Sequence, residues 1–292
     1  MELRLPSRIA VLLLVMLSCV RTARAGELDG PRGEFSSPIL GRNILVAKGV
    51  FSPIEAEKQV LPYMKDQGHL FKGKAVLDIG TGTGIIGLYA AQLGARIVVA
   101  TDINEAALSC TQLNAKRLGV DGVVETRWVG PKDIKAFSVI GPEESFDIII
   151  SNPPYTLDLD AAANTALYDQ GDLGFSIVRG LQAHLSPGGM AILLYNTFFY
   201  HEVIARFARH LGYEVENFSP DYSTPWEQDI LYNSYLKKIF EREKLDSQAF
   251  KFDWLKDQRS KAVDLFKLYP GLTMPKERGL YPGLIIIKHK EG

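Results

Sequence analysis

A short apolar segment that leads into a glycine-rich turn and then into a helix-like segment constrains this fold more than any other feature. The segment is Lys74–Ile79, the turn is Gly80–Gly84, and the mostly apolar residues Ile85–Ala91 follow directly. Glycines at a strand-to-helix turn adopt conformations closed to other residues and let a ligand approach the main chain. The pattern therefore predicts a strand, a ligand-binding turn and a helix of a parallel α/β sheet.

The next apolar run ends at an acidic residue. Asp102 follows Ile97–Thr101 and lies 22 residues after Gly80 (102 − 80). This spacing is typical of an acid at the tip of a second strand that binds the ribose hydroxyls of an adenosine-containing cofactor. The dinucleotide fingerprint is Gly-x-Gly-x-x-Gly, but here the spacing is Gly-x-Gly-x-Gly and Ile85 stands where the third glycine of that fingerprint would be. The departure favours a cofactor other than NAD, with an ordinary strand–helix turn as the alternative.

Strand-like and helix-like segments alternate along most of the chain, as expected for a parallel sheet covered by helices. Residues 219–281 depart from this alternation. Their alternating charges favour a solvated helical insertion, and their aromatic residues leave a substrate-selecting lid as the alternative. The predicted fold is Rossmann-like: a doubly wound, mostly parallel, seven-stranded sheet with a helical insertion before the last strand. The strands are expected at 74–79, 97–101, 122–128, 146–150, 190–195, 213–218 and 283–289.

A group of hydrogen-bond acceptors follows the expected fourth strand. The apolar run Phe146–Ile150 is followed by Ser151 and then by Asn152-Pro153-Pro154-Tyr155. The side-chain carbonyl of Asn152 and the backbone carbonyl of Pro153 can each accept one N–H of a planar NH2 group. Tyr155 can stack on the face of that group, and the prolines fix the backbone. These residues predict a site for a planar, NH2-bearing substrate, with a plain loop corner as the alternative.

The chain resembles a known family at both of these places. Val76–Gly84 resembles motif I of the class I S-adenosylmethionine-dependent methyltransferases, and Asn152–Tyr155 resembles the Asn-Pro-Pro-Tyr motif of their amino-methylating branch. The resemblance covers about residues 49–195 and implies an enzyme with S-adenosyl-L-methionine as cofactor. It implies that the catalytic residues are Asn152, Pro153, Pro154 and Tyr155. It also implies that the cofactor is bound by Asp78, Gly80, Thr81, Gly82, Gly84, Asp102, Ile103 and Asn152.

Two further cofactor contacts are candidates with a structural alternative. Asp133, after the third strand, is either an adenine contact or a solvated loop acid. Phe51 either covers the cofactor or holds the N-terminal segment in place.

The acceptor of the methyl group is less constrained. Ser52–Glu57 is similar to the Pro-Glu-Thr-Glu segment of HemK-type release-factor glutamine methyltransferases, which favours a protein glutamine-type amide. The first alternative is a nucleic-acid methyltransferase acting on adenine N6 or guanine N2. The balance of 33 Lys and Arg against 34 Asp and Glu provides no overall positive field for such a polyanion. The second alternative is a non-catalytic scaffold that binds the cofactor, although such a scaffold has no need for Asn152.

The N-terminus has the features of a secretory signal peptide. Arg4 and Arg8 precede and flank an apolar stretch that extends to Val20, and the small-x-small sequence Ala23–Ala25 follows. Export conflicts with a cofactor that is a cytoplasmic metabolite. Three alternatives stay open: export to the periplasm or medium, an uncleaved segment that contacts the membrane, and a cytoplasmic protein whose start codon is wrongly placed.

The expected organisation of the chain follows from these segments. No metal is expected, because the five histidines show no metal-ligand spacing, and the sequence does not indicate an oligomeric state. The predicted divisions are a signal-peptide-like segment at 1–25, an N-terminal segment covering the cofactor site at 26–72, a methyltransferase core at 73–218, the insertion at 219–281 and a final strand at 282–292.

Overall fold

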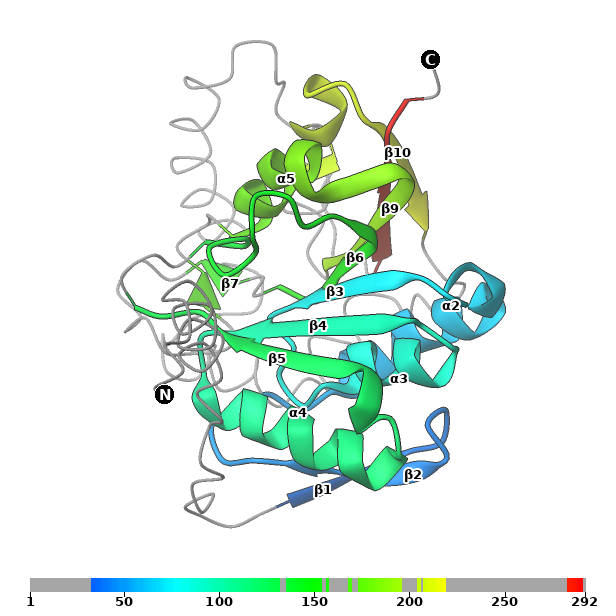
Figure 1. Ribbon diagram of the computed structural model, residues 1–292, viewed down its shortest axis with the longest axis vertical. Helices are drawn as coiled ribbons and strands as arrows, with labels where there is room; N and C mark the ends of the chain where they lie inside the picture. The colour runs from blue at the N-terminus through cyan, green and yellow to red at the C-terminus, as the bar shows by residue number, and fades with distance from the viewer. Residues whose placement is uncertain are drawn as a thin grey trace, which may run out of the picture.

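A seven-stranded sheet forms the centre of the protein (Figure 1). The computed structural model describes residues 33–131, 135–153, 156–157, 168–169, 173–195, 204–205, 207–218 and 283–290. The strand order is β10-β11-β9-β6-β3-β4-β5. The strands are β3 (Ala75–Ile79), β4 (Ile97–Asp102), β5 (Val124–Trp128), β6 (Phe146–Ser151), β9 (Leu185–Tyr195), β10 (Glu214–Phe218) and β11 (Gly283–Lys288).

The directions of these strands confirm the predicted fold class. Strands β5, β4, β3, β6 and β9 pair in parallel. Strand β11 is antiparallel to both of its neighbours, β9 and β10. The sheet is therefore mostly parallel, and the last strand of the chain is inserted in the opposite direction.

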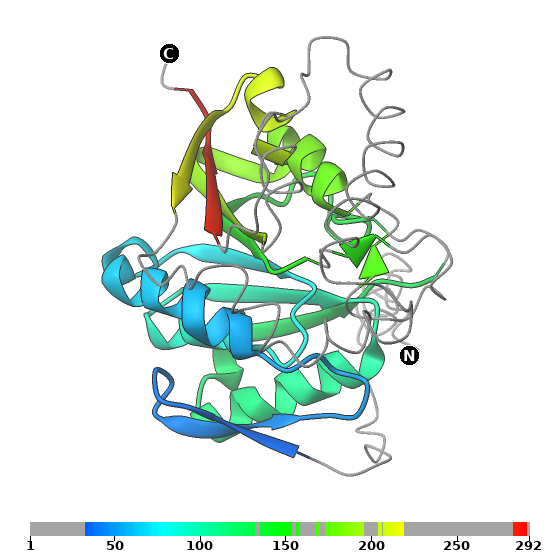
Figure 2. The same ribbon diagram turned by 180° about the vertical axis from the view of Figure 1, so that it is seen from behind.

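Helices cover both faces of the sheet (Figures 1 and 2). Because successive side chains of a strand point to opposite faces, neighbouring residues of β3 enter different cores. Leu77 lies in the core that includes α5, and Val76 in the core that includes α2 and α3. The helices are α2 (Leu61–Asp66), α3 (Ile85–Gln92), α4 (Glu105–Leu118) and α5 (Leu173–His184), with shorter turns η1 (Ala56–Val60), η2 (Gly68–Leu70) and η3 (Asp121–Val123).

An antiparallel hairpin precedes this α/β unit and was not predicted. It consists of β1 (Gly33–Ser37) and β2 (Arg42–Val46). In both views α4 lies between the hairpin and the sheet (Figures 1 and 2). Glu57 holds the hairpin turn, since its carboxylate accepts hydrogen bonds from Ser37 Oγ at 2.6 Å and Ile39 N at 3.1 Å. Within the described residues, the second glutamate of the Ser52–Glu57 segment thus serves to attach the hairpin.

Strand β9 begins earlier than the sequence predicted. The strand was expected at 190–195, but Leu185 already pairs with Phe146. The register then shifts, so that the next pair is Ile148 with Met190. Gly189 packs closely in this irregularity, because a Cβ there would lie 2.7 Å from the carbonyl oxygen of Asp147. The residues between Leu185 and Met190 therefore form an irregularity inside β9.

Several predicted features lie outside the described residues. These are the signal-peptide-like segment, the insertion at 219–281 and the site candidates Asp133, Pro154 and Tyr155. A two-residue parallel pair, β7 (Thr156–Leu157) with β8 (Tyr168–Asp169), follows Asn152–Tyr155 in the sequence. Among the helices that the structure describes, none combines the length and apolar character needed to cross a membrane.

A glycine in α5 provides a test of the packing on one face. A Cβ at Gly180 would overlap the ring of Phe137, which stacks on His184 with ring centroids 4.6 Å apart. Gly180→Ala is therefore expected to lower the free energy of unfolding by about 1–3 kcal/mol through overpacking. At an unhindered helix position the same change raises it by about 1 kcal/mol. Urea unfolding measures the difference.

The matched control for Gly180→Ala is the same substitution in a Phe137→Ala background. Removing the ring removes the overlap, so the alanine is then expected to be neutral or stabilising. Equal effects in both backgrounds would contradict the assignment of the cost to Phe137.

Candidate active site

The two predicted site segments lie side by side at the carboxyl ends of adjacent strands. The order of the sheet reverses between β3 and β6, and ligands of open α/β sheets bind at such a switch point. Strand β3 ends at Ile79 before the glycine turn, and β6 ends at Ser151 before Asn152. Ile79 and Ser151 are register partners, and Ser151 Oγ donates a hydrogen bond to Ile79 O at 2.8 Å. The sheet therefore brings the glycine turn and Asn152 to one crevice.

The glycine turn is fixed by hydrogen bonds to the end of β4. The amides of Gly80 and Thr81 both donate to Thr101 O, at 2.8 and 3.0 Å. Gly80, Gly82 and Gly84 all have positive φ, between 57° and 85°. A Cβ at Gly84 would also lie 2.8 Å from Thr111 Cγ2, so glycine is required there. At Gly80 a Cβ would meet no atom within 4 Å, which leaves the main chain open to a ligand.

Asp78 holds the turn to the start of α3. Its Oδ2 accepts hydrogen bonds from Thr81 Oγ1 at 2.7 Å and from Gly87 N at 3.0 Å. The side chain is buried. Burial raises the pKa of Asp78 from its ordinary 3.8 to about 6, and the nearby Asp102 adds to the rise.

This raised pKa predicts a pH dependence of stability. The folded protein keeps the Asp78 proton between about pH 4 and pH 6, where the unfolded chain has lost it, so the free energy of unfolding falls as the pH rises through this range. Asp78→Asn removes the titration and keeps an oxygen acceptor. The stability of the variant relative to the original protein is therefore expected to rise by about 2–3 kcal/mol from pH 4 to pH 7. Urea unfolding across this range measures the difference, and parallel curves for the two proteins would contradict it.

Asp102 joins the glycine turn to the start of α4. Its Oδ2 accepts from Gly82 N at 2.9 Å and its Oδ1 from Asn104 N at 2.8 Å. Burial raises the pKa of Asp102. A carboxylate has about four acceptor positions, so both oxygens can still accept a ribose hydroxyl, which fits the implied cofactor. Asn104 caps α4 as its position in the sequence suggests, with Oδ1 accepting from Ala106 N at 2.9 Å.

An exposed tryptophan, which was not among the predicted site residues, lies beside Asp102. Trp128 ends β5 in register with Asp102, and its Nε1 donates to Ile103 O at 3.0 Å. Both side chains are unusually exposed for apolar residues, Ile103 at 43% and Trp128 at 45%. Together they present an apolar surface beside the acid. The signal available in the sequence was the position of Trp128 at the end of the strand that follows Asp102.

Asn152 has an unused acceptor. Its Oδ1 is buried and has no hydrogen-bond partner in the part of the chain that the structure describes. The adjacent Pro153 is buried. An orphaned buried oxygen is costly unless a ligand or water supplies a donor. The arrangement therefore fits a ligand that carries N–H groups.

The segment before the first helical turn passes over the glycine turn. Val50 Cγ1 lies 3.9 Å from the position that a Cβ on Gly82 would take. Gly49 O accepts a hydrogen bond from Asn104 Nδ2 at 3.1 Å. Phe51, the predicted cover of the cofactor, is half-buried next to Val50. Val50 therefore lies close to the turn, and the covering role of Phe51 stays a prediction.

The sequence matches one protein family and several curated proteins. The "Methyltransferase small domain" family matches residues 42–217. The release factor glutamine methyltransferase of Koribacter versatilis is 32% identical over 168 residues, which is 52% of this chain and 57% of that protein. The protein of the same name from Cereibacter sphaeroides is 38% identical over 133 residues, 40% of this chain and 45% of that protein.

A third relative has a different acceptor in its name. The tRNA1(Val) (adenine(37)-N6)-methyltransferase of Bacteroides fragilis is 32% identical over 118 residues, 39% of this chain and 48% of that protein. This chain thus spans about half the length of each of these three relatives. The family match itself covers more than half of the 292 residues, including the glycine turn, Asp102 and Asn152. On this match, the chain belongs to the methyltransferase small domain family.

Proposed function

We propose that this protein is an S-adenosylmethionine-dependent N-methyltransferase whose acceptor is a planar amide nitrogen, of the protein glutamine type. The observation that carries the proposal is the buried, unpartnered Oδ1 of Asn152 at the switch point, next to the glycine turn. Family membership supports the reaction class, and the names of the two release-factor relatives support the acceptor.

Several residues would hold the cofactor. S-Adenosylmethionine supplies, when bound, a methyl group that is already activated on a sulfonium. Asp102 would accept hydrogen bonds from the ribose hydroxyls, and the exposed faces of Ile103 and Trp128 would contact the adenine ring. The open main chain at Gly80 leaves room for the ligand close to the turn. These roles use the strand ends on one side of the switch point.

Asn152 and Pro153 would hold the acceptor on the other side. The Asn152 side-chain carbonyl and the Pro153 backbone carbonyl would each accept one N–H of the substrate amide. Holding both N–H groups turns the nitrogen lone pair toward the methyl group, so the gain is mainly one of orientation. The same two oxygens would stabilise the positive charge that develops on the nitrogen. The proton can leave after transfer, so the mechanism requires no strong base.

Adenine N6 is the second candidate acceptor. The relative from Bacteroides fragilis favours it, and an exocyclic amino group offers the same two N–H donors as a glutamine amide. The net charge of −1 favours the protein acceptor, because nucleic-acid substrates are usually drawn by a positive field.

The test combines the full chain and methyl-labelled S-adenosylmethionine with either a glutamine-containing release factor or tRNA. Label that protease releases from the release factor supports the proposal, and label that only nuclease releases from tRNA supports the second candidate. Asn152→Ala serves as the control for background transfer. Absence of transfer to either acceptor, with cofactor binding demonstrated, would refute both acceptors.

The cellular location stays a prediction, because residues 1–32 lie outside the described part of the chain. For residues 1–25 we propose two of the alternatives that the sequence leaves open: a cleaved export signal, or a cytoplasmic protein whose start codon is wrongly placed, in keeping with a cytoplasmic cofactor. N-terminal sequencing of protein purified from its own cells tests the first: an N-terminus at Gly26 supports export, and an N-terminus at or near Met1 contradicts it.

A further inference from the structure

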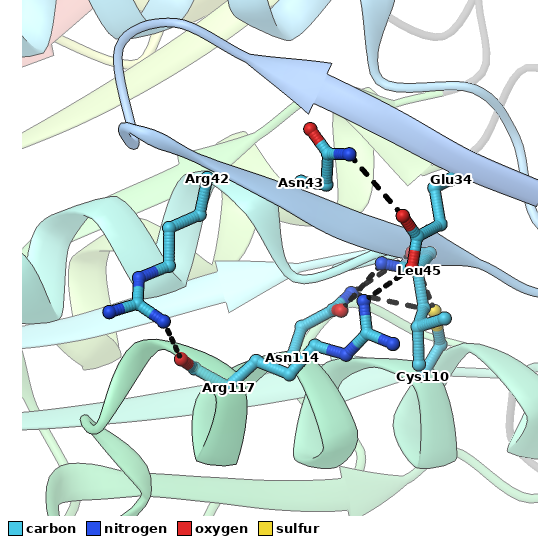
Figure 3. Close-up of polar contacts among 7 residues, drawn as sticks. All are labelled: Glu34, Arg42, Asn43, Leu45, Cys110, Asn114 and Arg117. Atoms are coloured by element: carbon cyan, nitrogen blue, oxygen red, sulfur yellow. Dashed lines mark hydrogen bonds and ion pairs between the residues drawn. The ribbon is translucent and has the colours of Figure 1, made fainter.

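Strand β2 has one edge that faces helix α4. Since β1 and β2 form a two-stranded sheet, backbone groups of alternate β2 residues point away from β1. At Leu45 these groups meet the side chain of Asn114, as Figure 3 shows. Leu45 N donates to Asn114 Oδ1 at 2.7 Å, and Asn114 Nδ2 donates to Leu45 O at 3.0 Å. The side-chain amide therefore pairs with the strand as a peptide group of a third strand would.

The same amide also holds the glycine turn. Asn114 Nδ2 donates a second hydrogen bond to Thr83 O at 2.9 Å. Asn114 is 0% exposed, Leu45 7% and Thr83 2%. Water cannot readily replace these hydrogen bonds at buried positions, so losing the Asn114 donor is costly at Thr83 O, whereas Leu45 O also accepts from Cys110 Sγ at 3.1 Å. One side chain thus fixes the hairpin and the glycine turn to each other.

A neighbouring residue of α4 reinforces the hold on the turn. Thr111 Oγ1 donates to Gly82 O at 3.3 Å, so two successive carbonyls of the turn accept hydrogen bonds from α4. The amide of Gly82 donates to Asp102. The side chains of α4 therefore bind carbonyls of the turn, whereas the carboxylate that is proposed to bind ribose accepts from one of its amides.

The position of β2 also determines what lies over the turn. The chain continues from Leu45 to Gly49, whose carbonyl accepts a hydrogen bond from Asn104 Nδ2. Val50 follows and lies next to Gly82. Asn104, which caps α4, and Asn114, which lies within α4, thus hold this segment at two points.

We propose that Asn114 is a positioning residue for cofactor binding, which holds the β1–β2 hairpin and the glycine turn in one binding-competent arrangement. This inference rests on the proposed function, because it requires that the turn bind the cofactor. It extends that function by making the hairpin a part of the cofactor site. Coupling of this kind is reciprocal, so a ligand at the turn must also stabilise the hairpin.

The first experiment measures the dissociation constant of S-adenosylhomocysteine by calorimetry. Asn114→Asp has the same size and keeps the acceptor for Leu45 N, but residue 114 can then donate to at most one of the two carbonyls. Leu45 O keeps the thiol of Cys110 as a donor at 3.1 Å, so the loss falls mainly on Thr83 O. The dissociation constant is expected to rise at least about tenfold. Val178→Ala, in the buried core on the opposite face of the sheet, is the control for lowered stability. It is expected to change the constant by less than about twofold at a comparable loss of melting temperature.

The second experiment needs no substitution and stays informative if Asn114→Asp does not fold. Hydrogen exchange of the unmodified full chain is followed with and without S-adenosylhomocysteine. The Leu45 amide, which donates to Asn114 Oδ1, is expected to exchange at least about fivefold more slowly when the ligand is present. The Leu181 amide in α5 serves as the internal reference.

The outcomes separate this inference from the proposed function. If the unmodified protein does not bind S-adenosylhomocysteine, the proposed function fails, and the inference fails with it. If it binds, but the Leu45 amide exchanges at the same rate with and without the ligand, the proposed function stands and the inference is overturned. Binding by Asn114→Asp within about twofold of the unmodified protein would overturn it equally.

Discussion

Asn152→Ala is expected to lower the rate of methyl transfer about 10²–10³-fold, the usual effect of removing one preorganised polar group that stabilises developing charge. The substitution deletes the buried Oδ1 that has no partner among the described residues. One N–H of the acceptor then has no partner, and the nitrogen lone pair is no longer held toward the methyl group. Single-turnover assays with methyl-labelled cofactor measure the loss.

Cofactor binding should survive this substitution. Groups of the glycine turn donate hydrogen bonds to Thr101 O, Asp102 and Asp78, and none of these hydrogen bonds involves Asn152. The dissociation constant of S-adenosylhomocysteine is therefore expected to stay within about twofold of that of the original protein. Asn152→Asp keeps an acceptor oxygen and is the matched variant, expected to retain more turnover than alanine. Equal loss of binding and turnover in Asn152→Ala would contradict the acceptor-holding role.

The main sheet could be predicted from the sequence because its signals are local. The buried strands β3 and β6 are mostly apolar, and the glycine turn and Asn152 follow them directly. Once the strands are parallel and adjacent, both strand ends must lie at the same edge. The alternation of strands and helices indicates the parallel sheet, whereas the adjacency of β3 and β6 is given by the structure.

The hairpin could not be predicted because its stability comes from distant contacts. Gly33–Ser37 is a short strand with mostly exposed residues, and a two-stranded hairpin of this kind is marginal by itself. It is held by Glu57 at its turn and by Asn114 at Leu45, which lie 20 and 69 residues away in the sequence. An asparagine inside a helix carries no sequence signal that it binds a strand. Trp128 was not predicted as a site residue for a similar reason, since its position beside Asp102 depends on the register of β5 with β4.

Asp78 shows that a correct position does not establish a role. The resemblance implied a cofactor-binding acid at this place. In the structure, Oδ2 of Asp78 is bound to Thr81 and Gly87, so the carboxylate shapes the turn from within. Direct contact with the cofactor stays a prediction for this residue, whereas its effect on the turn follows from the hydrogen bonds.

Asp102→Ala is expected to weaken cofactor binding about 10²-fold or more. The substitution removes the proposed partner of the ribose hydroxyls, and hydrogen bonds to a charged group contribute about 1.5–3 kcal/mol each. It also leaves the amides of Gly82 and Asn104 without their carboxylate, which loosens the turn and the start of α4 together. Calorimetry with S-adenosylhomocysteine measures the affinity directly.

Two variants distinguish these contributions from a general effect of charge. Asp102→Asn keeps one oxygen acceptor with nearly the same shape, so it is expected to lose only about tenfold in affinity. Asp121→Ala removes an exposed acid in η3 and changes the net charge equally, and it is expected to leave the affinity unchanged within about twofold. Unchanged binding in Asp102→Ala would refute the ribose assignment. Equal losses in Asp102→Ala and Asp121→Ala would instead assign the effect to net charge, because the two substitutions share only the removal of one negative charge.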